Sequence, residues 1–258
     1  MSTICELKKN ILIPPTEAHS AILELSAGCS WAKCSFCPQS AGVPLQAATP
    51  QMLANRLLEM VMRDEQSRRI FLAGENALAF KTQHILDVLE MARSYLPDIS
   101  SFSIYARAAD VRGKSDEQLL TLKQAGLKTV YIGIESGNEQ ILLNCRKGET
   151  TQQMKEQLLR LNALDIDYGL SVILGLGGES HWRENALDTA AFLSSVSPIS
   201  IRAMTLVLVK ATDLVKELKA GRFVPASAQT ILEEERLLVE NLHCMHTLII
   251  YIVIVTVK

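Results

Sequence analysis

Short apolar runs alternate with amphipathic segments along most of the chain, and this alternation predicts strands followed by helices. The runs are rich in Ile, Val, Leu, Phe and Tyr, and several are almost continuous. Continuous apolar runs of this length are typical of strands that are buried on both faces of a parallel sheet. The predicted strands are residues 21–26, 69–73, 101–106, 129–133, 168–174 and 199–207.

The segments between these runs carry signals for the beginning and end of helices. Thr49 precedes Pro50, as an N-cap precedes a proline in the first turn. Ser115 with Gln118 fits a capping box, and Gly126 stands where a left-handed C-cap would end a helix. The helix that Thr49 and Pro50 begin is predicted at residues 51–63, and further helices are predicted at residues 83–95, 183–195 and 228–241.

Strand order and spacing predict an α/β fold in one domain. The strand centres are roughly 25 to 50 residues apart, which leaves room for a crossover helix each time and therefore favours parallel strands. Six such units predict a partial (β/α)6 TIM-like barrel with outer helices. We expect the barrel at residues 20–242, after an N-terminal extension (residues 1–19) and before an apolar tail (residues 243–258).

The tail is unusual because it is a β-branched run, TLIIYIVIVTV. It is shorter than the about 20 residues that span a bilayer. Either it forms a last strand or the C-terminus is truncated or altered after about Asn241. We favour the second interpretation, because an uncovered apolar strand promotes aggregation. It predicts that removing residues 244–258 leaves the function intact.

Composition and charge narrow the possible functions. Apolar residues make up 48% of the chain and charged residues 21%, so a substantial core can form. The net charge of −2 gives no basic excess, and we therefore do not expect nucleic acid as a substrate. The first residues, MSTICELKKN, lack the layout of a secretory signal, which predicts a cytoplasmic protein without a membrane contact.

Cysteine spacing gives the strongest chemical signal. Cys29, Cys34 and Cys37 lie close together directly after the first predicted strand. Three thiolates can hold one iron–sulfur cluster, and a four-iron cube with three protein ligands leaves one iron open to another ligand. The alternative is a zinc knuckle, which needs a fourth ligand. A histidine or one of the scattered cysteines would have to supply it; these cysteines are Cys5, Cys145 and Cys244.

The segment GCSWAKCSFCP (residues 28–38) resembles the signature of the radical S-adenosylmethionine (SAM) superfamily, CxxxCxxC with an aromatic residue before the last cysteine. Phe36 fills the aromatic position. The first gap is one residue longer, as in a branch with segments similar to GCSxNxCTFC, and Ala32 stands where that branch commonly has Asn. The chain is also distantly similar to oxygen-independent coproporphyrinogen dehydrogenases. The resemblance implies a [4Fe–4S] cluster on the three clustered cysteines and a bound SAM.

Two of the next strand ends are implied to bind SAM as well. Gly74 and Glu75 follow the second strand and resemble a Gly-Gly-Glu segment that binds the amino group of SAM, although Gly74 also fits an ordinary turn. Ser103, Tyr105 and Arg107 end the third strand and share one face. Arg107 is implied to pair with the SAM carboxylate or the substrate. Alternatively, Asp110 or another acid neutralises it.

The fourth and fifth strand ends complete the implied SAM site. The fourth resembles the superfamily's YIGIESG segment, in which Glu135 and Ser136 would face the nucleoside and ribose. A carboxylate accepts hydrogen bonds from ribose hydroxyls, which favours this role over the alternative that Glu135 is an ordinary capping acid. Gly175 and Gly177 follow the fifth strand and would let the backbone approach the adenine. Glycines after strands are common, so this signal alone is weak.

The function implied by the resemblance is that of a radical SAM enzyme, with no catalytic side chain beyond the cluster ligands. Such an enzyme cleaves SAM reductively to methionine and a 5′-deoxyadenosyl radical, which abstracts hydrogen from a substrate. The substrate is unidentified, and we expect a small molecule. A flavodoxin- or ferredoxin-type protein would donate the electron. The alternatives are a non-enzymatic zinc or iron–sulfur protein and a truncated barrel that binds a cluster without turnover.

Overall fold

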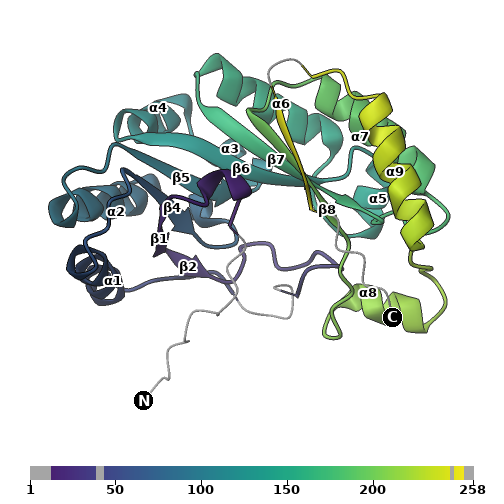
Figure 1. Cartoon of the computed structure of the whole chain (residues 1–258), viewed down its shortest axis with the longest axis horizontal. Coiled ribbons are helices and arrows are strands. Elements are labelled where there is room, and N and C mark those ends of the chain that lie inside the picture. Colours follow the sequence, from purple (N-terminus) through teal and green to yellow (C-terminus); the bar gives the residue numbers. More distant parts are fainter. Residues whose placement is uncertain (1–12, 39–43, 245–246, 253–258) are drawn as a thin grey trace.

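A computed structural model describes residues 13–38, 44–244 and 247–252. Its main feature is a sheet of seven strands, all paired in parallel, in the order β1-β4-β5-β6-β7-β8-β9 (Figure 1). A short antiparallel pair, β2 (Ser26–Ala27) with β3 (Gln46–Ala47), lies outside this sheet. The strands of the main sheet are β1 (Ala21–Glu24), β4 (Arg69–Ala73), β5 (Ser101–Ala106), β6 (Leu127–Glu135), β7 (Asp167–Leu174), β8 (Ser200–Thr205) and β9 (Leu248–Ile252).

Helices connect the strands and cover the outer side of the curved sheet (Figure 1). Two short 3-10 helices, η1 (Pro15–Glu17) and η3 (Ala77–Ala79), accompany them. The α-helices are α1 (Pro50–Met62), α2 (Thr82–Tyr95), α3 (Ala108–Arg112), α4 (Asp116–Gln124), α5 (Glu139–Asn144), α6 (Thr151–Ala163), α7 (Trp182–Ser194), α8 (Asp213–Lys219) and α9 (Ala228–Glu240). The prediction of an α/β partial barrel with parallel strands and outer helices is confirmed.

Local signals set the helix boundaries as predicted. The Thr49 side chain accepts a hydrogen bond from Met52 N and caps α1, and Ser115 and Gln118 form a capping box at α4. Gly126 follows α4 with φ of +95°, a backbone conformation that glycine adopts without a steric penalty. All six predicted strands are present. The tail adds a seventh, β9, which lies parallel to β8.

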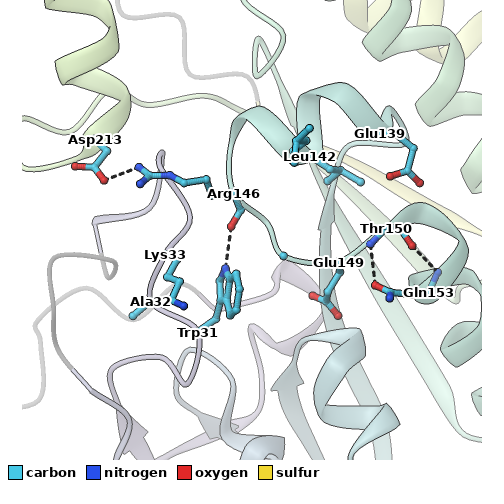
Figure 2. Close-up of a pocket in the computed structure, with 12 residues that line it drawn as sticks. Trp31, Ala32, Lys33, Glu139, Leu142, Arg146, Glu149, Thr150, Gln153 and Asp213 are labelled. Carbon is cyan, nitrogen blue, oxygen red and sulfur yellow. Dashed lines mark hydrogen bonds and ion pairs between the residues drawn. The ribbon is translucent and has the colours of Figure 1, made fainter.

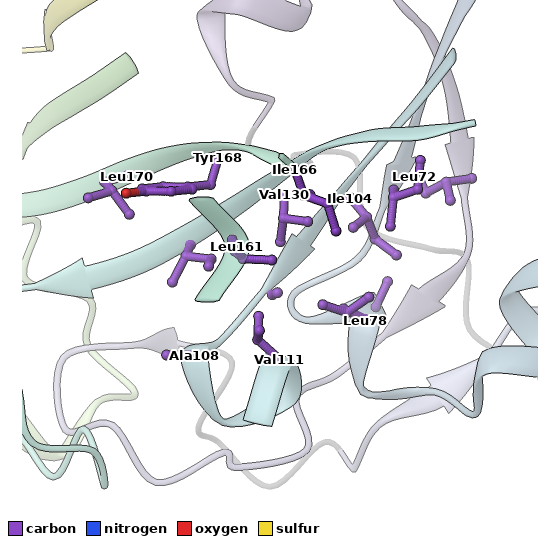
Figure 3. Close-up of a cluster of buried hydrophobic side chains, with 14 of the residues drawn as sticks. Leu72, Leu78, Ile104, Ala108, Val111, Val130, Leu161, Ile166, Tyr168 and Leu170 are labelled. Atoms are coloured by element: carbon purple, nitrogen blue, oxygen red, sulfur yellow. The ribbon is translucent and has the colours of Figure 1, made fainter. Parts of the chain in front are cut away.

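The strands divide their side chains between two faces of the sheet. On β4 and β5, Leu72 and Ile104 join the large core between the sheet and the helices, together with Val130 of β6 (Figure 3). The residues that alternate with them, such as Phe71 and Tyr105, form a second cluster on the concave face. This alternation follows from the two-residue period of a strand. It gives the concave face a cluster that is rich in aromatic side chains.

A buried ion pair closes the concave face near the amino-terminal ends of the strands. Glu17 of η1 is fully buried, and Arg69, the first residue of β4, lies 2.7 Å from its carboxylate. The Tyr131 hydroxyl donates to the same carboxylate at 2.6 Å. Burial opposes the charge of Glu17, but hydrogen bonds from Arg69, Ser20 and Tyr131 lower its pKa below the usual value. This end of the barrel is therefore filled, and the carboxyl ends of the strands are left for the site.

The apolar tail enters the sheet as an edge strand. β9 pairs with β8 from Ser200 with Leu248 to Met204 with Ile252, and Leu248 N donates to Ile199 O at 3.1 Å. The remaining tail and residues 1–12 of the N-terminal extension lie outside the described residues. Among the residues that are described, no helix has the length and apolar character needed to cross a bilayer.

Candidate functional site

The candidate site lies at the edge of the sheet where the parallel strands end. Because β1, β4, β5, β6 and β7 are neighbours in that order, their carboxyl ends meet along one edge. The cysteine loop (residues 28–38) follows β1 and β2 at this edge. Ser35 N of the loop donates to Cys145 O at 2.8 Å, and Leu214 N donates to Ser35 O, also at 2.8 Å. The loop therefore lies against the end of α5 and the beginning of α8.

The cysteine loop carries three free thiols that are neither fully buried nor fully exposed: Cys29, Cys34 and Cys37. Trp31 N donates to Cys29 Sγ at 3.4 Å, and Cys37 N donates to Cys34 O at 3.2 Å. Burial raises the pKa of Cys34 to about 12, so its proton is held firmly until a metal displaces it. In the described part of the chain, no three His, Cys, Asp or Glu side chains converge as ligands of a single ion.

The donor set fits an iron–sulfur cluster. The three thiols belong to one loop, which is how cysteines hold a cluster, and a cube distributes them over three different irons. A single zinc ion would instead need four ligands at about 2.0–2.3 Å from one point. The scattered cysteine beside this loop is Cys145, which is buried and donates its thiol to Leu142 O at 3.4 Å. The three loop cysteines therefore fit the ligand set of a [4Fe–4S] cluster, and Cys145 is not needed for it.

Trp31 fixes the outer side of the cysteine loop. Its indole nitrogen donates to Arg146 O at 2.8 Å, as Figure 2 shows. The Arg107 guanidinium lies 4.9 Å from the centre of the Trp31 ring and the Lys33 ammonium 4.6 Å from it. Cation–π contacts of this kind favour charge close to the ring face. Gly148 packs against the same ring, since a Cβ at Gly148 would lie 2.2 Å from Trp31 Cζ2.

Arg107 pairs with an acid of the protein itself, as in the alternative that Asp110 or another acid neutralises it. Its Nη2 lies 3.0 Å from Glu149 Oε2 and also donates to Lys147 O at 3.0 Å. Asp110 does not pair with the guanidinium but accepts the Arg107 backbone N–H at 2.7 Å and caps α3. Binding of the SAM carboxylate by Arg107 therefore stays a prediction.

Glu135 ends β6 in a strained conformation and meets a buried lysine. Its φ is +67°, and the register with β7 shifts between Gly133 and Glu135. Its Oε1 lies 2.9 Å from the ammonium of Lys147, whose side chain is only 4% exposed. Burial opposes the charge of Lys147, but Glu135, Cys34 and Glu149 raise its pKa above the usual value. The lysine is therefore a fixed cation between Glu135 and the cysteine loop.

The end of β4 contacts both the cysteine loop and α3. Gly74 passes so close to Ser26 that a Cβ would lie 2.0 Å from Ser26 Oγ. The fully buried Asn76 accepts from Ser30 N at 3.1 Å and donates to Ser30 Oγ at 2.6 Å and to Asp110 Oδ2 at 3.1 Å. Gly74 thus serves a close backbone approach, and Asn76 holds the beginning of the cysteine loop. The predicted contact of Gly74 and Glu75 with the SAM amino group stays a prediction.

Ser103 and Tyr105 are both on the concave face, as predicted from their spacing. Tyr105 packs edge-on against Phe71, with the ring centres 5.0 Å apart. The Ser103 hydroxyl is fully buried and has no hydrogen-bond partner within the described residues, whereas the Tyr105 hydroxyl lies beside Arg202. Buried hydroxyls are usually paired, so Ser103 marks a position where a polar ligand would be stabilised.

The loops after β6 and β7 are held by buried side chains of α7 and α9. The hydroxyl of Ser136 donates to Asn185 Oδ1, and Gly175, with φ of +80°, donates its N–H to Glu234 Oε2 at 2.8 Å. Gly177 lies so close to the beginning of α7 that a Cβ would be 2.7 Å from His181 O. The structure therefore brings Ser136, Gly175 and Gly177 to the same edge, next to Glu135.

Sequence reasoning missed several residues of this site, namely Asn76, Lys147, Glu149, Asn185 and Glu234. Only Asn76 is adjacent to a predicted site residue, directly after Glu75. Lys147 and Glu149 lie in the turn between α5 and α6, while Asn185 and Glu234 lie within helices. A buried polar residue inside a helix or a turn has no periodic signal, so nothing in the local pattern could have identified the other four.

A pocket of about 580 Å³ borders the outer side of the cysteine loop (Figure 2). Trp31 and Lys33 of the loop form one wall, and Leu142, Arg146 and Asp213 contribute to the others. Arg146 pairs with Asp213 across this pocket, which connects the turn after α5 to α8. The cysteine loop is therefore accessible from the outside on the side that carries Lys33.

Comparison with known proteins places this geometry in a family. Residues 23–190 match the model of the radical SAM superfamily. The chain is 26% identical over 204 residues to 4′-phospho-dehydrooxetanocin synthase of Priestia megaterium, a match that covers 71% of this chain and 27% of that protein. The chain thus spans about a quarter of the length of this curated relative.

Solved structures share the fold at low identity. Methylornithine synthase (PylB) has a TM-score of 0.60 at 12% identity, over 90% of this chain and 70% of that one. The radical SAM methyltransferase TsrM from Kitasatospora setae, solved with cobalamin and a [4Fe–4S] cluster, has a TM-score of 0.61 at 14% identity, over 78% of this chain and 39% of that one. None of these findings supports the finer likeness to coproporphyrinogen dehydrogenases. With its cysteine loop, its parallel partial barrel and this match, the chain belongs to the radical SAM superfamily.

Proposed function

We propose that this chain is a radical SAM enzyme whose cluster is held by Cys29, Cys34 and Cys37. The observation that carries the proposal is the position of these thiols, in one loop at the carboxyl edge of a parallel partial barrel. When bound, the reduced [4Fe–4S] cluster supplies the electron that cleaves SAM to methionine and a 5′-deoxyadenosyl radical, which abstracts hydrogen from the substrate. The protein's own residues bind and orient SAM and shield the hydrogen transfer from water.

Charge compensation is the first task of these residues. Three thiolates on one loop add negative charge to a partly buried site, where an unpaired charge is costly. Lys147 is buried close enough to Cys34 to act on the pKa of its thiol, and Arg107 holds Trp31 of the same loop. Both cations favour the thiolate form of Cys34, and each is at the same time paired with a carboxylate, Lys147 with Glu135 and Arg107 with Glu149.

Orientation of SAM is the second task. We assign the nucleoside side to Glu135, Ser136, Gly175 and Gly177, because all four lie at the adjacent ends of β6 and β7. The Glu135 carboxylate contacts Lys147 through Oε1, and its second oxygen is suited to accept ribose hydroxyls. Gly74, Glu75 and Arg107 are assigned to the amino and carboxylate groups of SAM, with Ser103 and Tyr105 below them on the concave face.

The remaining partners follow from charge and access. A flavodoxin- or ferredoxin-type protein would deliver the electron on the exposed side of the cysteine loop, where Lys33 lies. We propose that the substrate is a small molecule, because a net charge of −2 offers no basic excess for a nucleic-acid backbone. It would bind over the concave face, where the transferred hydrogen is shielded from water.

Release of 5′-deoxyadenosine tests the proposal. The protein is reconstituted with iron and sulfide without oxygen, given SAM and dithionite, and analysed for 5′-deoxyadenosine. The proposal predicts release by the wild type and by Cys145→Ala, and none by Cys34→Ala. A wild type that binds four irons but releases no 5′-deoxyadenosine would instead support a barrel without turnover. Zinc in place of iron would support the non-enzymatic alternative.

A further inference from the structure

We propose that Glu234 of α9 is a positioning residue for the nucleoside side of the SAM site. Its buried carboxylate holds in place both loops that follow β6 and β7, although it contacts no ligand itself. This inference rests on the proposed function, since it is to these loops that SAM contacts have been assigned. Glu234 lies far along the chain from both loops.

Both oxygens of the Glu234 carboxylate accept a hydrogen bond. Oε2 accepts the N–H of Gly175 at 2.8 Å, and Oε1 accepts the side-chain amide of Asn185 at 2.6 Å. Glu234 is 0% exposed, so water cannot replace either bond. Gly175 is the first residue after β7, and its φ of +80° makes the chain turn there. Its N–H faces Glu234 only in this turn conformation. The first contact therefore fixes the turn that begins the loop after β7.

Asn185 carries the second contact to the loop after β6. Its Oδ1 accepts the Ser136 hydroxyl, and the Ser136 oxygen in turn accepts Asn138 N at 3.0 Å. Thr189, one turn further along α7, accepts Gly137 N at 2.8 Å. Gly137 fits tightly there, since a Cβ would lie 2.4 Å from Asp188 O. Movement of Asn185 would thus release Ser136 and the backbone beside it.

A second carboxylate, that of Glu179, attaches the far end of the loop after β7 to α9. Glu179 accepts Ser227 N at 2.8 Å through one oxygen and the Thr230 hydroxyl at 2.8 Å through the other. Ser227 is the N-cap of α9, and α7 and α9 pack side by side (Figure 1). The loop after β7 is therefore attached to α9 at both of its ends, and Glu234 provides the buried attachment.

Two substitutions of Glu234 separate positioning from mere filling of space. Glu234→Met keeps a long side chain but removes both acceptors, so Gly175 N–H and the Asn185 amide are left unpaired. Glu234→Gln keeps an oxygen that accepts from Gly175 N–H. If the Asn185 side chain flips, its oxygen accepts from the new glutamine amide and its own amide donates to the Ser136 hydroxyl. Glu235→Met, at the next and half-buried position of α9, is the matched control.

Binding of SAM to the reconstituted, unreduced protein is the main readout. We expect Glu234→Met to weaken SAM binding about tenfold with unchanged iron content, and Glu234→Gln and Glu235→Met to stay within about twofold of the wild type. Wild-type affinity in Glu234→Met would overturn the proposal, as would equal weakening in Glu235→Met. If Glu234→Met does not fold, Asn185→Leu takes its place, with the same expected loss and the same overturning result.

Hydrogen exchange of the protein without SAM gives an independent readout. The proposal predicts faster exchange at residues 136–138 and 175–178 in Glu234→Met than in Glu235→Met, with α7 itself unchanged. Unchanged exchange in these loops would overturn it. If the wild type binds SAM but never releases 5′-deoxyadenosine, the proposed enzymatic function fails while the positioning role of Glu234 can still be shown by affinity and exchange.

Discussion

The ammonium of Lys147 lies 2.9 Å from the carboxylate of Glu135, and the two side chains are 4% and 12% exposed. Glu135 ends β6, whereas Lys147 lies in the turn between α5 and α6, next to Cys34 of the cysteine loop. A charged pair that is this deeply buried gives little net stability as a pair but is costly to break. The pair therefore joins the end of β6 to the turn that lies beside the cysteine loop.

Removing one partner of this pair should be much worse than removing both. Lys147→Met leaves the Glu135 carboxylate buried without its cation, and we expect a loss of about 3–5 kcal/mol in the free energy of unfolding. The double variant Lys147→Met/Glu135→Gln should recover part of that loss. Urea unfolding of the apo and the reconstituted protein measures both.

The exposed pair Lys123–Asp165 provides the control for this prediction. It has a similar distance of 2.8 Å, but Asp165 is 95% exposed. Lys123→Met should therefore cost at most about 1 kcal/mol. Equal effects of Lys147→Met and Lys123→Met would show that burial of the Glu135 pair has no energetic consequence.

Gly148 should be essential for the position of Trp31. Its φ is +76°, and a Cβ there would lie 2.2 Å from the Trp31 ring. Gly148→Ala therefore adds a displacement of Trp31 to the backbone cost of a left-handed alanine, which is about 1–2 kcal/mol. We expect faster loss of iron to a chelator, because Trp31 belongs to the cysteine loop.

Gly221 separates the two effects of this substitution. Its φ of +70° is almost the same, but a Cβ there meets nothing within 4 Å. Gly221→Ala should show the backbone cost alone and release iron at the wild-type rate. If the two alanine variants lose iron equally fast, contact between Gly148 and Trp31 does not hold the loop.

Cys145 distinguishes the cluster from a four-ligand metal site. It is buried and close enough to Cys34 for the charge of one thiol to affect the pKa of the other. Because the cluster needs only the three loop cysteines, Cys145→Ala should keep about four irons per chain, whereas Cys29→Ala, Cys34→Ala and Cys37→Ala should lose them. Loss of metal in Cys145→Ala would instead indicate that Cys145 is a fourth ligand.

Glu234 should make stability depend on pH. Burial raises its pKa from 4.5 to about 7, although Asn185 and Gly175 donate to it. Between these two values the folded chain keeps a proton that the unfolded chain has lost, so the contribution of Glu234 to stability falls as pH rises. The slope cannot exceed about 1.4 kcal/mol per pH unit.

Glu234→Gln is the reference for this dependence, since glutamine does not titrate. The free energy of unfolding of the wild type minus that of Glu234→Gln should decrease between about pH 5 and pH 7 and then level off. Parallel curves for the two proteins would contradict a raised pKa at this position.

Much of the fold could be predicted from the sequence, because its signals are local. Capping boxes, the N-cap Thr49 and the C-cap Gly126 depend on residues within one turn of each other, and the structure contains them. Burial on both faces of the sheet produced short apolar runs at the predicted strands, and several of these runs are almost continuous. The tail was harder to interpret, since an apolar run alone does not show whether a neighbouring strand such as β8 is available to pair with it.

The site was predictable only where the residues follow strand ends. Glu135, Ser136 and Gly175 were identified in this way, and parallel pairing brings them together. Their partners were not, because Lys147 and Glu234 approach from a turn and a helix, and only tertiary packing decides which buried groups face one another. Arg107 shows the same limit, since its partner Glu149 lies far along the chain, in the turn between α5 and α6.

The central claim is that three cysteines leave one iron of the cluster open to SAM, and electron–nuclear double resonance tests it most directly. The reduced, reconstituted protein is measured with SAM labelled with ¹⁷O in the carboxylate or ¹⁵N in the amino group. The account predicts a hyperfine coupling from each label to the cluster, which is lost in Cys34→Ala. A cluster that shows no coupling to either label, or a cluster with a fourth ligand from the protein, would contradict it.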